Sequence, residues 1–114
     1  MNTIMHLDNK NFNLFKDGKK SIETRLNDEK RSNLNIGDNI TFINRRTDEK
    51  LDFQIINLYK YSNFEELYRH HNKLDLGYKE DDIASPADMN IYYPIDKINK
   101  YGTVAIEVIR KEID

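Results

Sequence analysis

The amino-acid sequence predicts an α+β fold built on a small antiparallel β-barrel, curved or closed, with short helices on its flanks. Segments with the two-residue periodicity of strands outnumber helical segments, and polar hairpin connections join several of them. The helical segments are insertions between strands and do not alternate with them as they would in a parallel α/β sheet. The 114 residues match the length of one typical domain, so we expect a single domain over 1–114.

The first predicted elements are a strand and a short helix. Residues 3–7 form the strand, and Asp8 has the side chain of a helix N-cap. The helix that follows carries Phe12 and Phe15 on one side, which is the side expected to pack on the core. Gly18 suits the left-handed conformation that ends many helices, so the helix should stop there and lead the chain into two lysines.

Three further strands are predicted in the middle of the chain. Residues 21–26 form the second strand, and the polar loop over 27–35 that follows is long for a small domain, which suggests a functional role. Gly37 begins a turn before residues 39–44, which alternate apolar and polar side chains. Residues 51–61 have the longest strand pattern, in which Ile56 and Leu58 indicate either burial on the second face or a β-bulge midway.

Two short helices and a final strand complete the prediction. Residues 63–71 have apolar side chains at helical intervals behind a capping-box spacing. Ser85, followed by proline, predicts a second helix that runs towards Tyr92, and Pro94 breaks or kinks that helix. Residues 103–110 have the two-residue alternation of a strand.

The composition excludes several classes of function. The chain has no cysteine, which removes disulfides, thiolate metal sites and cysteine nucleophiles and agrees with the cytoplasm as the expected compartment. No stretch is apolar for long enough to span a bilayer, so we expect no membrane partner. The formal net charge of −2 argues against a strongly basic protein that holds long nucleic acid through many phosphates.

The sequence contains no recognisable metal, cofactor or triphosphate site. His6, His70 and His71 are the only imidazoles, and the adjacent pair would point about 100° apart on a helix, a geometry that does not chelate one ion. We expect surface or helix-end positions for them. The four glycines are too far apart for a phosphate loop, and no serine lies in a Gly-x-Ser-x-Gly elbow. We therefore expect neither a metal nor a cofactor.

The segment from Gly18 to Arg25 carries the strongest candidate site. Lys20 lies at the corner between helix and strand, and Glu23 and Arg25 share one face of the strand by its two-residue period. If that face is partly buried, the carboxylate holds both cations and leaves their other donors for a phosphate or a base edge. The alternative is a surface ion-pair cluster that stabilises the sheet by less than about 1 kcal/mol.

Three tyrosines near the last strand form a second candidate group. Tyr92, Tyr93 and Tyr101 flank the proline-containing segment, and aromatic rings beside basic groups can stack on bases. The alternative is that one or two of them seal the core beneath the short helices. A stacking role requires a ring that is exposed in a cleft.

Together these motifs resemble the ASCH domain family. The runs 25–31 and 62–68 are similar to those of a bacterial subgroup of small single-domain ASCH proteins, so the resemblance covers nearly the whole chain. Three further motifs support the resemblance. They are Gly18-Lys19-Lys20 with Glu23 and Arg25, Gly37-Asp38 before a strand, and Tyr101-Gly102 before the last strand.

The resemblance implies a PUA-like β-barrel with flanking helices and a cleft. The floor of that cleft would carry the Gly-x-Lys-x-x-x-x-Arg residues, here Gly18, Lys20 and Arg25. ASCH proteins are generally taken to bind RNA, and some act on nucleic acid or nucleosides, including N4-acetylcytidine amidohydrolases and a ribonuclease. The resemblance therefore implies binding of RNA or a nucleotide as the shared function and catalysis as the narrower one.

An enzymatic function would centre on Lys20, which matches the catalytic lysine of the ASCH amidohydrolases and would accept a proton or activate a nucleophile. Those enzymes carry a threonine three residues after the lysine, where this chain has Glu23. The hydroxyl of Thr24 should face the other side of the strand. The enzymes also need a downstream acid, for which the chain offers Asp75, Glu80 and Asp81.

The leading hypothesis from the sequence is a protein that binds RNA, a nucleotide or a modified nucleoside. The first alternative is a small hydrolase, an amidohydrolase or ribonuclease, that uses the same cleft with Lys20 and Glu23 as catalytic residues. The second alternative is a protein-interaction module in which the mixed charges are only surface. The binding hypothesis names Gly18, Lys19, Lys20, Glu23, Arg25, Tyr92 and Tyr101 as contact residues.

Overall fold

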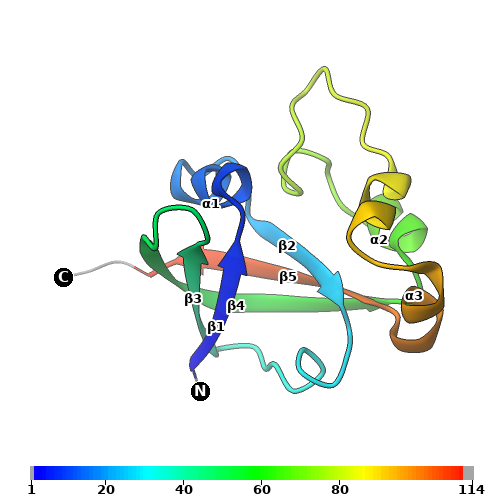
Figure 1. Ribbon diagram of the computed structural model, residues 1–114, viewed down its shortest axis with the longest axis horizontal. Helices are drawn as coiled ribbons and strands as arrows, with labels where there is room; N and C mark the ends of the chain where they lie inside the picture. The colour runs from blue at the N-terminus through cyan, green and yellow to red at the C-terminus, as the bar shows by residue number, and fades with distance from the viewer. Residues whose placement is uncertain (1, 112–114) are drawn as a thin grey trace.

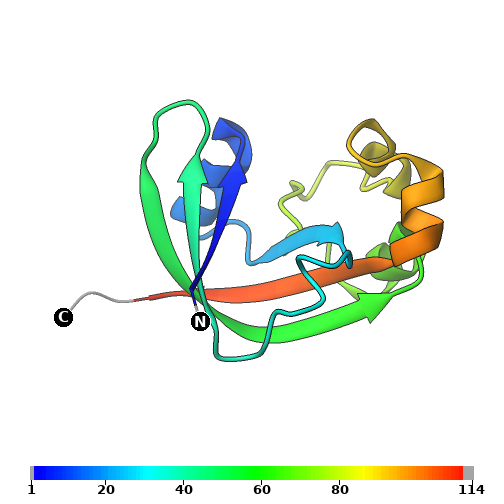
Figure 2. The same cartoon turned by 60° about the horizontal axis from the view of Figure 1, so that its bottom comes forward.

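The computed structural model describes residues 2–111 as a strongly curved five-stranded sheet with short helices around it (Figure 1). The strands lie in the order β1-β3-β4-β5-β2, so β1 and β2 are the two edges. Figure 2 shows the sheet bent into a half-barrel. The strands are β1 (Asn2–Leu7), β2 (Ile22–Leu26), β3 (Asn39–Asn44), β4 (Lys50–Tyr61) and β5 (Thr103–Arg110).

The predicted α+β class and barrel-like sheet are confirmed, with one difference in strand direction. β1 pairs with β3 in parallel, with Met5 opposite Phe42, whereas β3 with β4, β4 with β5 and β5 with β2 are antiparallel. The sheet is therefore mixed and not purely antiparallel. The physical reason is the length of the connection, because parallel neighbours need a crossover of a dozen or more residues. Here the helix, β2 and the polar loop all lie between β1 and β3.

The helices begin and end close to their predicted positions, but one of them was not predicted. Pro94 precedes the first turn of a helix over Ile95–Tyr101 and does not simply end the segment before it. A proline is tolerated there because the first turn of a helix has no intrahelical partner for its N–H groups. No helix in the described part of the chain is long and apolar enough to cross a membrane. The helices are α1 (Asn9–Lys16), α2 (Phe64–His70), the 3₁₀ helix η1 (Pro86–Ile91) and α3 (Ile95–Tyr101).

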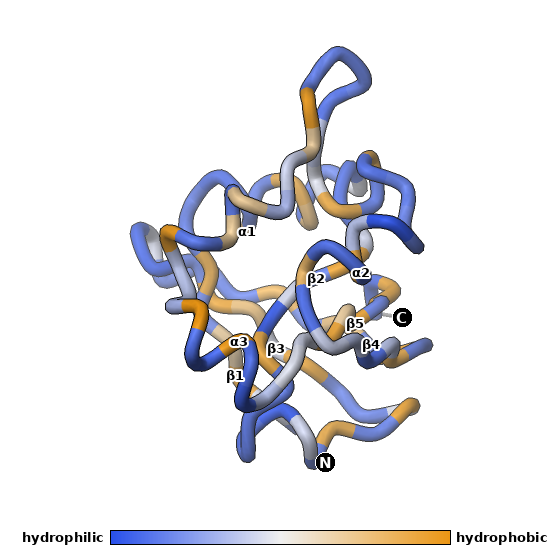
Figure 3. The backbone as a smooth tube through the Cα atoms, turned by 90° about the vertical axis from the view of Figure 1, so that its right-hand side faces the viewer, coloured by the Kyte–Doolittle hydropathy of each residue, from blue (hydrophilic) through white to orange (hydrophobic). Residues whose placement is uncertain are grey.

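The core consists of two apolar clusters that share the strands of the sheet. In the first, Phe15 of α1 lies with its ring centroid 4.7 Å from that of Phe42 and 5.7 Å from that of Phe53. In the second, α2 and α3 pack on β2 and β5. β5 supplies alternate residues to both clusters, Ile106 to the first and Ala105 to the second, as a strand buried on both faces must. Figure 3 shows that hydrophobic stretches concentrate on the strands, whereas the connections are mostly hydrophilic.

Two local features of the sheet shape the region around β2. The predicted irregularity in β4 is confirmed as a register shift between Ile55 and Asn57, which bends the sheet. The N-terminal end of β2 is tied to the segment that follows α2, because the backbone N–H groups of Ser21 and Ile22 both donate to the carbonyl oxygen of Asp75 at 3.0 Å. The connection between α2 and α3 is therefore anchored beside the edge strand.

Candidate functional site

A cleft of about 710 Å³ opens along the free edge of β2. Its lining comes mainly from the end of β1, from α1, from β2 and from the long connection between α2 and α3, and the loops after β2 and β3 add one arginine each. We call it the edge cleft. Its volume falls within the range of roughly 300–1,000 Å³ that is typical of pockets for small ligands.

Lys20 lies at the floor of the edge cleft because of the turn that ends α1. Gly18 has a φ of +74°, the left-handed conformation predicted for it, and the N–H groups of Lys19 and Lys20 then bond the carbonyl oxygen of Leu14 at 2.8 and 3.1 Å. The chain reverses here and carries the Lys20 side chain beneath α1. Only 8% of Lys20 is exposed, and its Nζ donates to Asn11 Oδ1 at 2.9 Å. The lysine is thus fixed by the helix whose end it follows.

Glu23 joins Lys20 to Arg25. Its Oε1 lies 3.3 Å from Lys20 Nζ, and its Oε2 accepts from Nε and Nη2 of Arg25 at 3.0 and 2.9 Å. Arg25 Nη2 also donates to the backbone carbonyl oxygen of His6 in β1 at 3.0 Å. We call Asn11, Lys20, Glu23 and Arg25 the floor cluster. It is a buried, charge-assisted network and not a solvated surface ion pair.

The charges of the floor cluster stabilise one another. Burial alone would raise the pKa of the Glu23 carboxyl, but Lys20 and Arg25 outweigh burial and hold that pKa below its usual value. Burial likewise opposes the charge of Arg25, but the Glu23 carboxylate raises the pKa of the guanidinium. With two cations and one anion, the cluster keeps one excess positive charge. One of the three N–H groups of the Lys20 ammonium also remains beyond the bonds to Asn11 and Glu23.

A row of hydroxyl groups forms the opposite wall of the edge cleft. Tyr78 donates to Asp88 Oδ2 at 2.8 Å, and the Tyr68 hydroxyl lies 2.9 Å from that of Tyr78. Since the Tyr78 proton is used on Asp88, Tyr68 is the donor in the second bond. Burial raises the pKa of both Tyr68 and Tyr78, so both hydroxyls stay protonated at neutral pH. This part of the lining is polar, and Asp82 and Asp88 give it negative charge.

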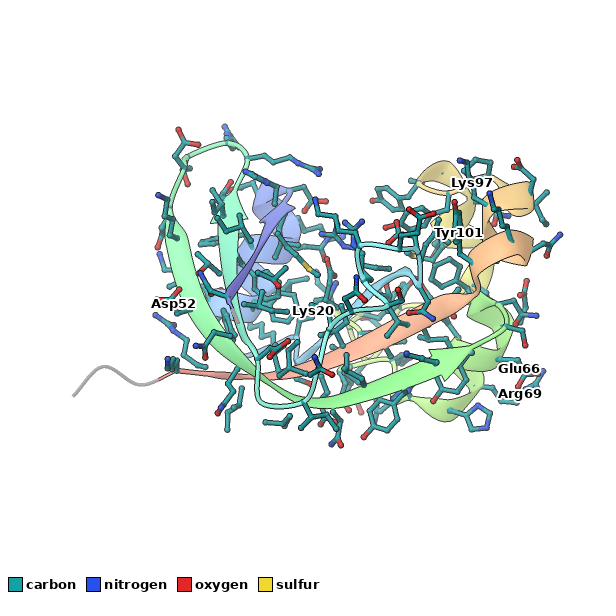
Figure 4. All side chains as sticks on the ribbon, turned by 90° about the horizontal axis from the view of Figure 1, so that it is seen from below. Lys20, Asp52, Glu66, Arg69, Lys97 and Tyr101 are labelled. Atoms are coloured by element: carbon teal, nitrogen blue, oxygen red, sulfur yellow. The ribbon has the colours of Figure 1, made fainter. Side chains whose placement is uncertain are left out.

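The structure brings together most, but not all, of the residues that the sequence singled out. Lys20, Glu23 and Arg25 meet at the floor, and Tyr92, which is 58% exposed, lines the same cleft. Gly18 and Lys19 are exposed and lie outside its lining, where Gly18 supplies the turn. Tyr101 does not join them, and Figure 4 shows Lys20 and Tyr101 on well separated parts of the molecule.

Tyr101 instead lines a second, smaller cavity of about 450 Å³. We call it the loop hollow, because the loop after β2 forms one side of it and α3 the other. Arg31 and Tyr93 line both cavities, so the loop hollow adjoins the edge cleft. The loop hollow is lined by Leu26, Asp28, Glu29, Lys30, Arg31, Tyr93, Pro94, Lys97 and Tyr101.

Comparison with known proteins identifies the family. The family model described as the ASCH domain matches residues 5–112. The chain belongs to the ASCH family. The resemblance of its motifs is therefore confirmed, and the half-barrel sheet described above is the sheet of an ASCH domain.

Two solved structures resemble this ASCH domain over almost its full length. The crystal structure of the hypothetical protein PH0355 has a TM-score of 0.82 and 30% identity, and the match covers 97% of this chain and 100% of that one. The solution structure of protein PF0455 from Pyrococcus furiosus has a TM-score of 0.70 and 32% identity, covering 99% and 100%. The comparison with curated proteins gives no significant match.

Several residues of the ASCH domain's cleft were not predicted from the sequence. Asn11 holds Lys20, yet a polar residue on a helix gives no signal that separates a buried role from an exposed one. Gly77 packs on the lysine stem, since a Cβ there would lie 3.0 Å from Lys20 Cδ. The contact of His6 is through its backbone carbonyl, which no side-chain pattern can reveal. Arg31 is the exception, because it lies in the polar loop over 27–35, whose length in the sequence suggested a functional role.

The histidines lie where the sequence placed them, at the surface and at a helix end. His70 stacks on Tyr61 with ring centroids 5.3 Å apart, whereas the Nε2 atom of His71 lies 2.9 Å from the Tyr61 hydroxyl. Burial lowers the pKa of His71. Among residues 2–111 no group of three or more histidine, aspartate or glutamate side chains is arranged to hold a metal ion.

Lys20, Glu23 and Thr24 of the hydrolase alternative all line the edge cleft, whereas its candidate downstream acids do not. Glu23 faces Lys20, and the Thr24 hydroxyl lies 4.0 Å from the sulfur of Met89, another residue of the cleft lining. Asp75 contributes its backbone carbonyl to β2. The acids that line the edge cleft from the α2–α3 connection are Asp82 and Asp88, and not Asp75, Glu80 or Asp81.

Proposed function

We propose that this ASCH domain binds RNA or a nucleotide, modified nucleosides included, in the edge cleft. The observation that carries the proposal is the buried floor cluster, in which Glu23 fixes Lys20 and Arg25 at the bottom of a cavity of nucleotide size. Lys20 and Arg25 would contact a phosphate or a base edge, and Glu23 would hold them in position. Cations held in this way bind without the entropy cost of ordering flexible side chains at the moment of binding.

The rim of the edge cleft supplies the other groups that a nucleotide requires. Tyr92 is exposed there and offers a ring on which a base can stack, an interaction worth about 1–3 kcal/mol per base. Lys10, Arg31 and Arg45 also line the cleft. Its five cations face four carboxylates, so the lining keeps an excess of one positive charge. An aromatic ring beside cations is the combination that recognises unpaired nucleotides.

The charge of the chain supports a short ligand. A formal net charge of −2 supplies no extended basic surface, so few phosphates could be neutralised at once. We therefore propose a single nucleotide or a short single strand as the ligand, in place of a long duplex.

Ligand-observed NMR tests the proposal. The purified protein is mixed with a panel of nucleosides, including N4-acetylcytidine, the ribonucleoside monophosphates and short single-stranded RNAs. The variant Lys20→Met with Glu23→Gln removes one buried cation together with the anion, and Arg25 keeps its bond to the His6 carbonyl oxygen. Lys16→Met with Glu49→Gln makes the same chemical change at an exposed ion pair and serves as the matched control.

We expect at least one ligand of the panel to bind the wild type and the control variant Lys16→Met with Glu49→Gln with similar affinity. The same ligand should bind the variant Lys20→Met with Glu23→Gln, here called the floor-cluster variant, much more weakly. Equal binding by all three proteins would place the ligand elsewhere and contradict the proposal. If no ligand of the panel binds, a protein-interaction module becomes the better hypothesis for the function.

One observation favours hydrolysis in the same cleft as a second candidate function. The buried Lys20 ammonium lies 3.3 Å from the Glu23 carboxylate, and a lysine and a carboxylate so placed form a pair that can carry a proton. Hydrolysis of N4-acetylcytidine would release acetate and cytidine, both visible in the same NMR samples over time. An acetate signal that grows with the wild type and not with the floor-cluster variant supports the enzyme, and unchanged N4-acetylcytidine and RNA samples rule it out.

A further inference from the structure

We infer that the ligand is single-stranded RNA of at least two nucleotides, with one nucleotide in the edge cleft and its neighbour in the loop hollow. The inference rests on the proposed function and assigns the loop hollow as a second nucleotide subsite. Three features support this inference: the residues that the two cavities share, the groups at the far end of the loop hollow, and the charge of the lining of the loop hollow.

Arg31 lies at the boundary between the two cavities. Its backbone N–H and its Nη1 both bond the Asp28 carboxylate, at 3.1 and 3.2 Å, so the side chain is held in place. Its Nε is buried and pairs with no described residue, so Asp28 does not use all the hydrogen-bonding capacity of the guanidinium. A guanidinium that contacts both cavities is placed to bind the phosphate that joins two successive nucleotides.

Tyr93 is the second residue at the boundary. Its ring stacks on that of Phe64 with centroids 5.8 Å apart and an angle of 17° between the ring planes, which fixes its orientation. Burial raises the pKa of the Tyr93 hydroxyl, and the nearby Arg25 only partly opposes this, so the hydroxyl remains a donor at neutral pH. The boundary therefore offers a rigid aromatic ring and a hydroxyl as well as a cation.

The far end of the loop hollow has the composition of a stacking site. Lys97 and Tyr101 are four residues apart on α3 and line the hollow together (Figure 4). The Lys100 ammonium lies 5.1 Å from the centroid of the Tyr101 ring, which adds a further positive charge beside it. The Tyr101 ring and Lys97 in the lining match the combination that single-stranded nucleic acid requires, a surface for the base and charge for the phosphate.

The charge of the lining favours an anionic ligand. Lys30, Arg31 and Lys97 face Asp28 and Glu29 in the loop hollow, an excess of one positive charge. Asp28 is already paired with Arg31. Two adjoining cavities, each with a tyrosine and cations, fit successive nucleotides of one strand better than they fit one nucleotide alone.

Isothermal titration of ribonucleoside monophosphates and of single-stranded RNA trinucleotides tests this inference. The key variant is Lys97→Glu, which reverses a charge in the loop hollow without altering the edge cleft. Lys60→Glu is the matched control, because Lys60 is also exposed and lines neither cavity, and the two variants have the same net charge. The monophosphates report on the edge cleft alone.

The expected result is that the best trinucleotide binds the wild type at least about tenfold more tightly than its monophosphate, as one further stacked base implies. Lys97→Glu should remove most of that difference and leave monophosphate binding within about twofold, whereas Lys60→Glu should retain it. If monophosphates and trinucleotides bind with equal affinity and Lys97→Glu changes neither, the second subsite is wrong and the proposed function stands. If neither binds, the proposed function fails and this inference fails with it.

Discussion

Arg25 of β2 donates to the backbone carbonyl oxygen of His6 in β1 at 3.0 Å, and this bond joins the two edges of the sheet. β1 and β2 stand at opposite ends of the strand order, so backbone pairing does not connect them. The same guanidinium is held by Glu23 through Nε and Nη2. Arg25, one of the residues proposed to bind the ligand, therefore also links the two edges of the curved sheet.

Replacing Arg25 should destabilise the fold more than replacing an exposed arginine. Arg25→Met leaves the His6 carbonyl without its donor and Glu23 with one cation, so we expect a loss of about 1–3 kcal/mol in the free energy of unfolding. Arg69→Met breaks an ion pair with Glu66 in which Arg69 is 67% exposed, and it should cost less than about 1 kcal/mol. Urea unfolding of both variants measures the difference, and equal losses would show that Arg25 has no bridging role.

Removing the charge of Glu23 should be the most damaging single change in the floor cluster. Glu23→Gln leaves Lys20 and Arg25 largely buried without a counter-charge, so we expect a loss of about 3–5 kcal/mol. The variant Lys20→Met with Glu23→Gln should recover part of this loss, because one of the two cations goes with the anion. Thermal or urea unfolding compares the two. A double variant that is less stable than Glu23→Gln would disprove the mutual compensation of these charges.

The stability of the protein should depend on pH through Glu23. Its pKa is lowered in the folded state, so the unfolded chain binds more protons between the folded pKa and the ordinary carboxyl value of about 4.3. The contribution of Glu23 is therefore complete above that ordinary value and is lost as the pH falls through the folded pKa.

Urea unfolding measured from pH 6 down to pH 3 checks this dependence on pH. The variant Lys20→Met with Glu23→Gln lacks the titrating carboxyl and serves as the reference. The free energy of unfolding of the wild type should fall more steeply with decreasing pH than that of the reference. Parallel curves would mean that Glu23 does not titrate as described.

Gly77 should be needed for the position of Lys20. Both Gly77 and Gly37 have positive φ, +100° and +96°, so alanine is strained at either position by about 1 kcal/mol. Of the two, only Gly77 would bring the added Cβ against side chains, Lys20 Cδ at 3.0 Å and Leu14 Cδ1 at 3.3 Å, whereas nothing lies within 4 Å at Gly37. Both variants should lose stability to a similar degree, but Gly77→Ala should also weaken ligand binding severalfold. Equal affinities of the two variants would contradict the contact.

Most of the fold could be predicted from the sequence because its strands follow simple periodicity. The strands over 39–44 and 103–110 were predicted with their observed bounds, and the irregularity within 51–61 was predicted as well. The parallel direction of β1 could not be predicted, because a two-residue pattern does not encode the direction of the partner strand. α3 was missed because Pro94 was interpreted as the end of a helix when it precedes the start of one.

The centre of the candidate site was predictable, but its surroundings were not. Glu23 and Arg25 share a face of β2, and a spacing of two residues is enough to show this. The partners that bury the cluster come from distant parts of the chain, Asn11 from α1 and Gly77 from the connection after α2, and only the tertiary structure brings them to Lys20. Tyr101 was grouped with Tyr92 by proximity in sequence, although α3 carries it to the loop hollow.

The most direct test of the account is a two-dimensional NMR titration of the isotope-labelled protein with the tightest-binding RNA or nucleotide. Backbone amide shifts then map the ligand on the structure. We expect the largest shifts on Lys20, Glu23, Arg25 and Tyr92, and we expect them to disappear in the variant Lys20→Met with Glu23→Gln. Shifts confined to another face, such as the stacked pair Tyr61 and His70, or shifts that persist in the variant, would contradict a binding site built on the floor cluster.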